Sequence, residues 1–183
     1  MRGCRKSLSF ALVIMSVVTA CYAEYLHGNG NFHMVMTDEA YRSGQLDEDE
    51  LTHYITMYKI KSILNLQGPN MNSKWYVDEL RLSSQVGIVH HDLSISANRM
   101  VSDEELRAIV NILRKTPKPV LIHCRSGADR AGLVAALYQY AIAGKTAEEA
   151  SNQLSILYGH FPFLGNSTVM MDRSFWRYVD VKS

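Results

Sequence analysis

The sequence predicts an α/β fold: one domain in which a mostly parallel sheet of four or five strands is flanked by helices. Short apolar runs alternate with segments of helical periodicity, which is the order of elements in a parallel or mixed sheet. The 183 residues, 47% hydrophobic and 20% charged, suit one globular domain and are few for two. A tight loop at residues 123–130, between a buried strand and a helix, is the third indication, because open α/β sheets bind ligands where strands end.

Strands are expected where short apolar runs end at turn residues. Residues 61–66 form such a run and stop at Gly68-Pro69. Residues 120–122 are apolar throughout, as in a strand that is covered on both faces. In chain order, the expected strands are 32–36, 40–44, 61–66, 88–95 and 120–122.

Helices are expected where apolar residues recur at helical spacing. Ser102 and Glu105 form a capping box, and apolar residues then recur until Pro117 ends the helix. Thr146 opens a later helix that is expected to run to about Tyr158. In chain order, the expected helices are 48–58, 75–84, 102–116, 131–143, 146–158 and 169–178.

The first 23 residues have the composition of a secretory signal peptide, which precedes a domain at 24–183. Three positive residues come before an apolar stretch, Leu8–Ala20, whose 13 residues are too few for a membrane-spanning helix of about 20. Cys21-Tyr22-Ala23 then offers small residues for cleavage after Ala23. An exported protein, periplasmic or secreted, is therefore expected.

A second processing site overlaps the first. The segment Val18–Cys21 resembles a bacterial lipobox, in which the cysteine is lipidated and becomes the new N-terminus. Lipidation of Cys21 would anchor the protein to a membrane, whereas cleavage after Ala23 would release it. Both alternatives stay open at the level of sequence.

The charge of the mature chain excludes some partners. Removal of Arg2, Arg5 and Lys6 with the leader leaves 16 Lys and Arg against 18 Asp and Glu, a net charge of −2. A nearly neutral domain gives no electrostatic reason to expect nucleic acid, and no polybasic patch indicates anionic lipid. The sequence says nothing about the oligomeric state.

Cys124 is the only cysteine of the expected domain, since Cys4 and Cys21 lie in the leader. Exported proteins usually pair their cysteines or avoid them, so a single one is a candidate reactive thiol. It begins a loop at the N-terminus of a helix, where N–H groups and the helix dipole favour an anion and a thiolate.

The loop after Cys124 carries the other groups that phosphoryl transfer needs. Arg130 presents a planar fork that suits two phosphate oxygens. Gly127 allows a tight turn, so that successive N–H groups converge on an anion. We therefore expect Cys124 to be the nucleophile that forms a phosphocysteine. The expected phosphate-binding residues are Arg125, Ser126, Gly127, Ala128, Asp129 and Arg130.

The segment His123–Gly132 resembles the signature of the cysteine-based protein phosphatases, in their dual-specificity-like branch. Tyr41–Gln45 and Ile63–Leu66 are similar to the opening segments of exported bacterial tyrosine phosphatases of this type. The resemblance implies the cysteine-phosphatase fold, no metal or other cofactor, and phosphorylated protein or phospholipid substrates. It also implies that Cys124 attacks, that Arg130 binds phosphate and that His123 tunes the thiol.

The general acid that the family implies is missing from its expected place. It should lie on the loop between the strand that ends near Ile95 and the helix that starts at Ser102. That loop contains no carboxylate, and Asn98 stands where the acid is expected. Three carboxylates remain as candidates: Asp92 in a strand, Asp103 in the first turn of a helix, and Asp129 within the loop itself. We favour Asp129 as the catalytic carboxylate.

A second departure is Ala131, where the family usually has a hydroxyl that helps the thiolate leave. Two functions from different classes follow. The first is a phosphatase for phosphotyrosine, phosphoserine or phosphothreonine in proteins, or alternatively for phosphoinositides. The second is a phosphate-binding module with weak turnover. A sulfurtransferase of rhodanese type also has a strand–cysteine loop–helix, but Arg130 favours the phosphatase. His160, which follows Gly159, is either a residue near the site or, as we favour, a turn residue.

Overall fold

The structure is a computed structural model, which describes residues 13–17, 22, 24, 28–163 and 165–182. The predicted cleavage site at Ala23 and the lipobox cysteine Cys21 lie outside the described residues. Within the described part, no helix combines the length and the apolar character that crossing a membrane requires.

Five strands form one sheet in the order β1-β2-β5-β3-β4. The edge strand β1 is antiparallel to β2, and the other neighbouring pairs are parallel. The predicted mostly parallel α/β sheet of four or five strands is thus confirmed, with five strands. The strands are β1 (His33–Met36), β2 (Ala40–Ser43), β3 (Ser62–Asn65), β4 (Val89–Asp92) and β5 (Val120–His123).

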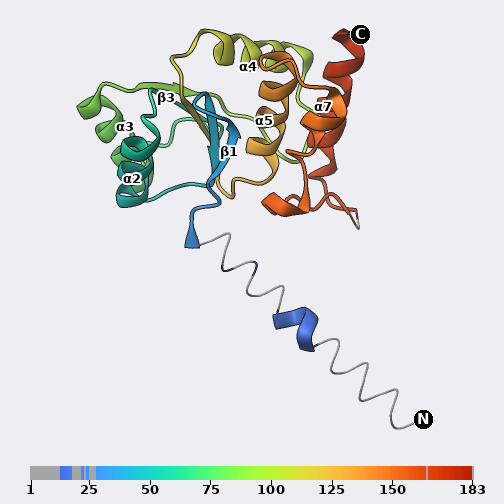
Figure 1. Cartoon of the computed structure of the whole chain (residues 1–183), viewed down its shortest axis with the longest axis horizontal. Coiled ribbons are helices and arrows are strands. Elements are labelled where there is room, and N and C mark those ends of the chain that lie inside the picture. The colour runs from blue at the N-terminus through green and yellow to red at the C-terminus, as the bar shows by residue number, and fades with distance from the viewer. Residues whose placement is uncertain (1–12, 18–21, 23, 25–27, 164, 183) are drawn as a thin grey trace.

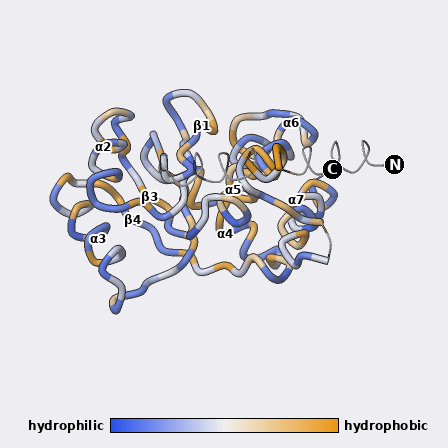
Figure 2. Tube along the Cα trace, turned by 90° about the horizontal axis from the view of Figure 1, so that it is seen from below, coloured by the Kyte–Doolittle hydropathy of each residue, from blue (hydrophilic) through white to orange (hydrophobic). Residues whose placement is uncertain are grey.

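Helices cover both faces of the sheet, and each face has its own apolar core. The views in Figures 1 and 2 agree that α2 and α3 lie on one side of the strands and that α4, α5 and α7 lie on the other. The helices are α2 (Glu48–Tyr58), α3 (Lys74–Val86), α4 (Asp103–Lys115), α5 (Asp129–Ala141), α6 (Ala147–Ser151) and α7 (Val169–Lys182), with a 3₁₀ turn η1 (Ile156–Tyr158).

The register of the parallel strands brings four polar residues to one edge of the sheet. His123, the last residue of β5, pairs with Ser43 of β2 and with Asn65 of β3. Asn65 in turn pairs with Asp92 of β4. Because these strands run in the same direction, their carboxyl ends and the loops that follow them meet at this edge.

The predicted helix from Thr146 to Tyr158 is wrong in its second half. Helix α6 ends at Ser151, and the next residues form tighter turns, in which the Gln153 and Leu154 N–H groups bond to carbonyls three residues back. Leaving the helix frees the Gln153 carbonyl to accept a hydrogen bond from Arg42 of β2. The chain is therefore diverted by a tertiary contact that helical periodicity does not contain.

Candidate active site

The loop of residues 124–128 joins β5 to α5 and packs tightly against the end of β2. Cys124 is buried, and its N–H points to the Ser43 carbonyl at 3.4 Å. Gly127 has φ +74°, and a Cβ built there would lie 2.5 Å from the Gly44 nitrogen. Only glycine fits at position 127, for both the backbone conformation and the space.

A buried arginine holds the far end of this loop from outside. The Arg42 guanidinium, fully buried, donates to the carbonyls of Gly127 at 2.7 Å and Ala128 at 2.9 Å. Its other terminal nitrogen donates to the Gln153 carbonyl at 2.6 Å, and the group lies 4.3 Å from the centre of the Tyr158 ring. Burial lowers the pKa of Arg42 to about 10, which leaves it charged at neutral pH.

The two preceding carbonyls of the loop are also bonded on the outside. The Asn31 side chain donates to the Ser126 carbonyl at 2.8 Å and to the Tyr158 carbonyl at 3.0 Å. The Gln45 N–H donates to the Arg125 carbonyl at 3.1 Å. Four consecutive carbonyls, at residues 125–128, therefore have partners outside the loop.

The N–H groups of the same loop are in the opposite situation. Within the described part of the chain, the N–H groups of Arg125, Ser126 and Gly127 make no hydrogen bond. A segment whose carbonyls are bonded outward and whose N–H groups are unpaired is built to receive an anion. Sequence analysis expected this cradle but did not identify Arg42 and Asn31 as its supports.

Arg130 lies in the first turn of α5 and reaches across to the ends of β3 and β4. Its Nη1 donates to the Leu66 carbonyl at 3.1 Å and to the Ile95 carbonyl at 3.4 Å. Among the described residues, the other guanidinium nitrogens have no partner. The fork is thus fixed by one nitrogen and has donors left for a ligand at the loop.

His123 shares a buried carboxylate, Glu79, with His90 behind the loop. Glu79 of α3 accepts from the His123 ring at 3.1 Å and from the His90 ring at 2.8 Å. Burial alone would raise the pKa of Glu79, but the nearby His123 and the bonds from both histidines outweigh it and lower the pKa to about 2. The ring of His91 contacts the Thr116 hydroxyl instead, so the adjacent His90 and His91 have different partners. No group of side chains suited to hold a metal ion occurs among the described residues.

The loop in which the family's acid was expected has no carboxylate. The Asn98 Oδ1 accepts a hydrogen bond from the Ser167 hydroxyl at 2.8 Å, and Arg99 pairs with Glu105. Asp103, the candidate that follows this loop, forms an ion pair with Arg177 at 2.8 Å.

Asp92 is occupied as an acceptor at the end of β4. Tyr76 donates to it at 2.6 Å and Asn65 at 2.7 Å. Burial and the bond to Asp92 raise the pKa of Tyr76 to about 12, so the phenol keeps its proton and remains the donor. Asp92 and Asp103 are therefore held in contacts within the protein.

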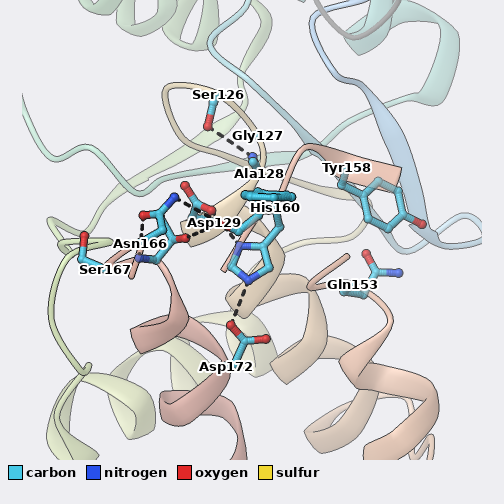
Figure 3. Close-up of polar contacts among 12 residues, drawn as sticks. Ser126, Gly127, Ala128, Asp129, Gln153, Tyr158, His160, Asn166, Ser167 and Asp172 are labelled. Carbon is cyan, nitrogen blue, oxygen red and sulfur yellow. Dashed lines mark hydrogen bonds and ion pairs between the residues drawn. The ribbon is translucent and has the colours of Figure 1, made fainter. Parts of the chain in front are cut away.

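Asp129 contacts His160, for which the sequence favoured a turn over a place near the site. His160 is completely buried, and its two ring nitrogens contact Asp129 at 2.7 Å and Asp172 at 2.9 Å, so the alternative near the site is the correct one. Figure 3 shows the ring between the two carboxylates. Burial lowers the pKa of His160, but the bonds to both carboxylates outweigh it and raise the pKa to about 9. Nothing in the local sequence indicates this contact, because its partners are 31 and 12 residues away.

A cavity of about 320 Å³ lies beside the loop. One wall is made by loop residues, including Arg125 and Asp129, and the opposite wall by the chain before β1, the β2–α2 connection and η1. Its lining residues are Gly30, Asn31, Gly44, Gln45, Glu50, Arg125, Ser126, Ala128, Asp129, Tyr158 and Gly159. The loop therefore borders a space that can hold part of a ligand.

Residues 37–164 match the family model described as PTP-SAK, the DSP-PTPase phosphatase domain of Swiss Army Knife proteins. The chain has no match among curated proteins. Solved structures with a similar fold include TpbA of P. aeruginosa, with a TM-score of 0.58, 19% identity, and coverage of 81% of this chain and 91% of TpbA. The catalytic core of Siw14 from S. cerevisiae has a TM-score of 0.62 and 20% identity, with coverage of 78% of this chain and 84% of Siw14. PTPMT1 has a TM-score of 0.61 and 11% identity, with coverage of 82% of this chain and 98% of PTPMT1.

Proposed function

The chain belongs to the DSP-PTPase phosphatase domain family of Swiss Army Knife proteins, within the cysteine-based, dual-specificity-like phosphatases, and we propose that it cleaves phosphate monoesters through a phosphocysteine on Cys124. The family assignment supports a hydrolase that acts on phosphate esters. The proposal adds the nucleophile, the intermediate and the roles of the neighbouring residues.

One observation carries the proposal: the carbonyls of residues 125–128 are bonded outward, while the N–H groups of Arg125, Ser126 and Gly127 have no partner among the described residues. A phosphoryl group held by these N–H groups and by the free nitrogens of Arg130 would face the Cys124 sulfur. Attack by the thiolate would form the S–P bond as the P–O bond to the leaving group breaks. Water would then release inorganic phosphate and restore the thiolate.

The proposed substrates are proteins that carry phosphotyrosine, phosphoserine or phosphothreonine, and no cofactor is needed. Two solved structures of this fold point to different substrates: TpbA was determined in complex with phosphotyrosine, and Siw14 is described as a PP-IP phosphatase. The resemblance to the family keeps a phosphoinositide phosphatase as the second candidate, and a phosphate-binding protein with weak turnover is the third.

The test is release of phosphate from 4-nitrophenyl phosphate by the purified protein. We expect turnover by the wild type, none by Cys124→Ser, and a labelled phosphoenzyme that is acid-stable when the reaction is quenched early. Arg130→Lys keeps the charge but loses the fork, so its KM should rise. If the wild type binds phosphate but releases none from any ester, the protein is a phosphate-binding protein, and the proposed phosphatase activity is refuted.

We also propose that the protein is exported, because the first 23 residues carry the features of a signal peptide. Mass spectrometry of the N-terminus in the native host separates the two processing routes. Cleavage after Ala23 gives a chain that begins at Glu24, and the lipobox route gives a lipidated Cys21. An intact Met1 in the cytoplasmic fraction would contradict both.

A further inference from the structure

The two carboxylate oxygens of Asp129 are in different situations. Oδ1 contacts the ring of His160, whereas Oδ2 has no partner among the described residues. The side chain is 22% exposed, and the residue lines the cavity beside the phosphate loop. Asp129 therefore has one unpartnered oxygen on a partly exposed side chain of a residue that lines the cavity.

The contacts of His160 determine the proton content of this cluster. An ionised carboxylate only accepts hydrogen bonds, so a ring that bonds to two of them donates from both nitrogens and carries a positive charge. The ring is buried between Asp129 of α5 and Asp172 of α7, and Arg42 of β2 is the further charge that acts on Asp129. The raised pKa of His160 agrees with this arrangement. Asp129 is thus held through Oδ1 by a cationic ring, while Oδ2 remains a hydrogen-bond acceptor with no partner among the described residues.

The other carboxylates near the site offer no replacement for the acid. Asp92 and Asp103 are held by Tyr76 and Arg177, and Asn98 cannot release a proton. Glu50 also lines the cavity, but its Oε2 accepts the Asp47 N–H as part of the α2 cap. In the structure Asp92, Asp103 and Glu50 therefore act as acceptors in contacts within the protein.

We propose that Asp129, oriented by His160 as a positioning residue, is the general base for hydrolysis of the phosphocysteine and does not protonate the leaving group. The site then favours esters whose oxygen departs as an anion, which means aryl phosphates such as phosphotyrosine rather than alkyl phosphates such as phosphoserine, phosphothreonine or phosphoinositides. This inference rests on the proposed function.

The two steps balance without a further reactant. In the first, the Cys124 thiolate forms the S–P bond, the P–O bond breaks, and the aryloxide leaves as an anion and takes a proton from solvent. In the second, water attacks phosphorus, its proton passes to Oδ2 of Asp129, and the S–P bond breaks to return the thiolate. Asp129 then loses the proton to solvent.

The first test uses the wild type and a series of aryl phosphates of rising leaving-group pKa, followed by a phosphoserine peptide. Phosphoenzyme formation should slow steeply along the series, and the alkyl ester should react at least about 100-fold more slowly than phosphotyrosine in a peptide of the same sequence. Equal rates for the two peptides would overturn the proposal, because they require a proton donor.

The second test separates the two steps in variants by stopped-flow. Asp129→Asn should leave the burst of aryloxide within a few-fold of wild type and slow the steady-state phase about 10²-fold, so that phosphoenzyme accumulates. His160→Gln should act in the same direction with a smaller loss. Asp103→Asn, also in the first turn of a helix, is the matched control and should change neither phase.

Two outcomes would overturn the proposal even if the variants differ in stability. One is that the rate of the aryloxide burst in Asp129→Asn falls more for poor leaving groups than for good ones, as expected when a general acid has been removed. The other is an equal loss in both phases for His160→Gln, which indicates a general structural defect. Absence of any phosphoenzyme in the wild type would instead refute the proposed function, so the two failures are distinguishable.

Discussion

The two flanks of the phosphate loop are built differently. On the flank of β2 and η1, Arg42 and Asn31 bond three loop carbonyls, and His160 holds Asp129. On the flank of β3 and β4, Arg130 is fixed by only two carbonyl contacts, one of them at 3.4 Å. There the loop around Asn98 is largely exposed.

The groups that shape the loop and the carboxylate that we propose as its general base therefore come from the same side. In the family pattern, the acid stands on the flank of β4, where Asn98 now bonds to Ser167. The flank of β2 keeps a carboxylate next to the loop, but it is paired with a cation. We call the flank of β2 and η1 the rigid flank and the flank of β3 and β4 the open flank. We infer that phosphate capture depends on the rigid flank and that the open flank has lost the group that protonates the leaving oxygen.

The largest effect is expected from Arg42→Met, which removes the main support of the rigid flank. The carbonyls of Gly127 and Gln153 would be left buried without this donor, and each such group costs about 1–3 kcal/mol. We expect a loss of about 4 kcal/mol or more in urea denaturation, together with loss of phosphate binding. Arg177→Met is the control, because its surface pair with Asp103 contributes at most about 1 kcal/mol. Equal losses of unfolding free energy in Arg42→Met and Arg177→Met would contradict the inference that Arg42 supports the loop.

The sequence contains enough to predict the loop but not its supports. Strands 120–123 and 62–65, the capping box at Ser102 and the segment from Cys124 to Arg130 follow from local patterns, and the structure has them within a few residues. Arg42 bonds to residues 85 and 111 positions away, and no periodicity or spacing indicates such contacts. The same holds for His160, whose burial depends on α7 packing beside α5.

His160→Gln tests whether the rigid flank depends on a charge. The pKa of His160 is raised from 6.5 to about 9, so its contribution is complete below pH 6.5 and is lost as the pH rises through 9. Wild-type stability should therefore fall by roughly 3 kcal/mol over this window, and the variant should lack that fall. His53→Gln, an exposed position, is the control. Parallel stability curves for wild type and His160→Gln in urea denaturation would contradict the ion-pair assignment.

Asn98→Asp tests whether the open flank lacks only its acid. Aspartate is close to asparagine in shape and can accept the same bond from Ser167, so stability should change by less than about 0.5 kcal/mol. We expect phosphoenzyme formation from a phosphoserine peptide to rise about 10-fold, with little change for 4-nitrophenyl phosphate. A matched Asn152→Asp at the end of α6 should change neither rate. No gain with the alkyl ester would mean that the loop is too far from the leaving oxygen.

Ala131→Ser is expected to have the smallest effect, and it acts on the second step alone. Ala131 and Cys124 are buried in the same apolar cluster, and the side chain at position 131 offers no hydroxyl to a thiolate that leaves phosphorus. A serine there could donate to the sulfur and speed hydrolysis of the phosphocysteine by a few-fold, about 1 kcal/mol of stabilisation. The measurement is the ratio of burst rate to steady-state rate. Ala135→Ser, one turn later in α5 and equally buried, is the control, because its hydroxyl costs stability without reaching the loop. If Ala131→Ser lowers both the burst rate and the steady-state rate, and only destabilises the protein as Ala135→Ser does, the apolar surroundings of the sulfur do not limit hydrolysis of the phosphocysteine. Slow hydrolysis must then come from Asp129.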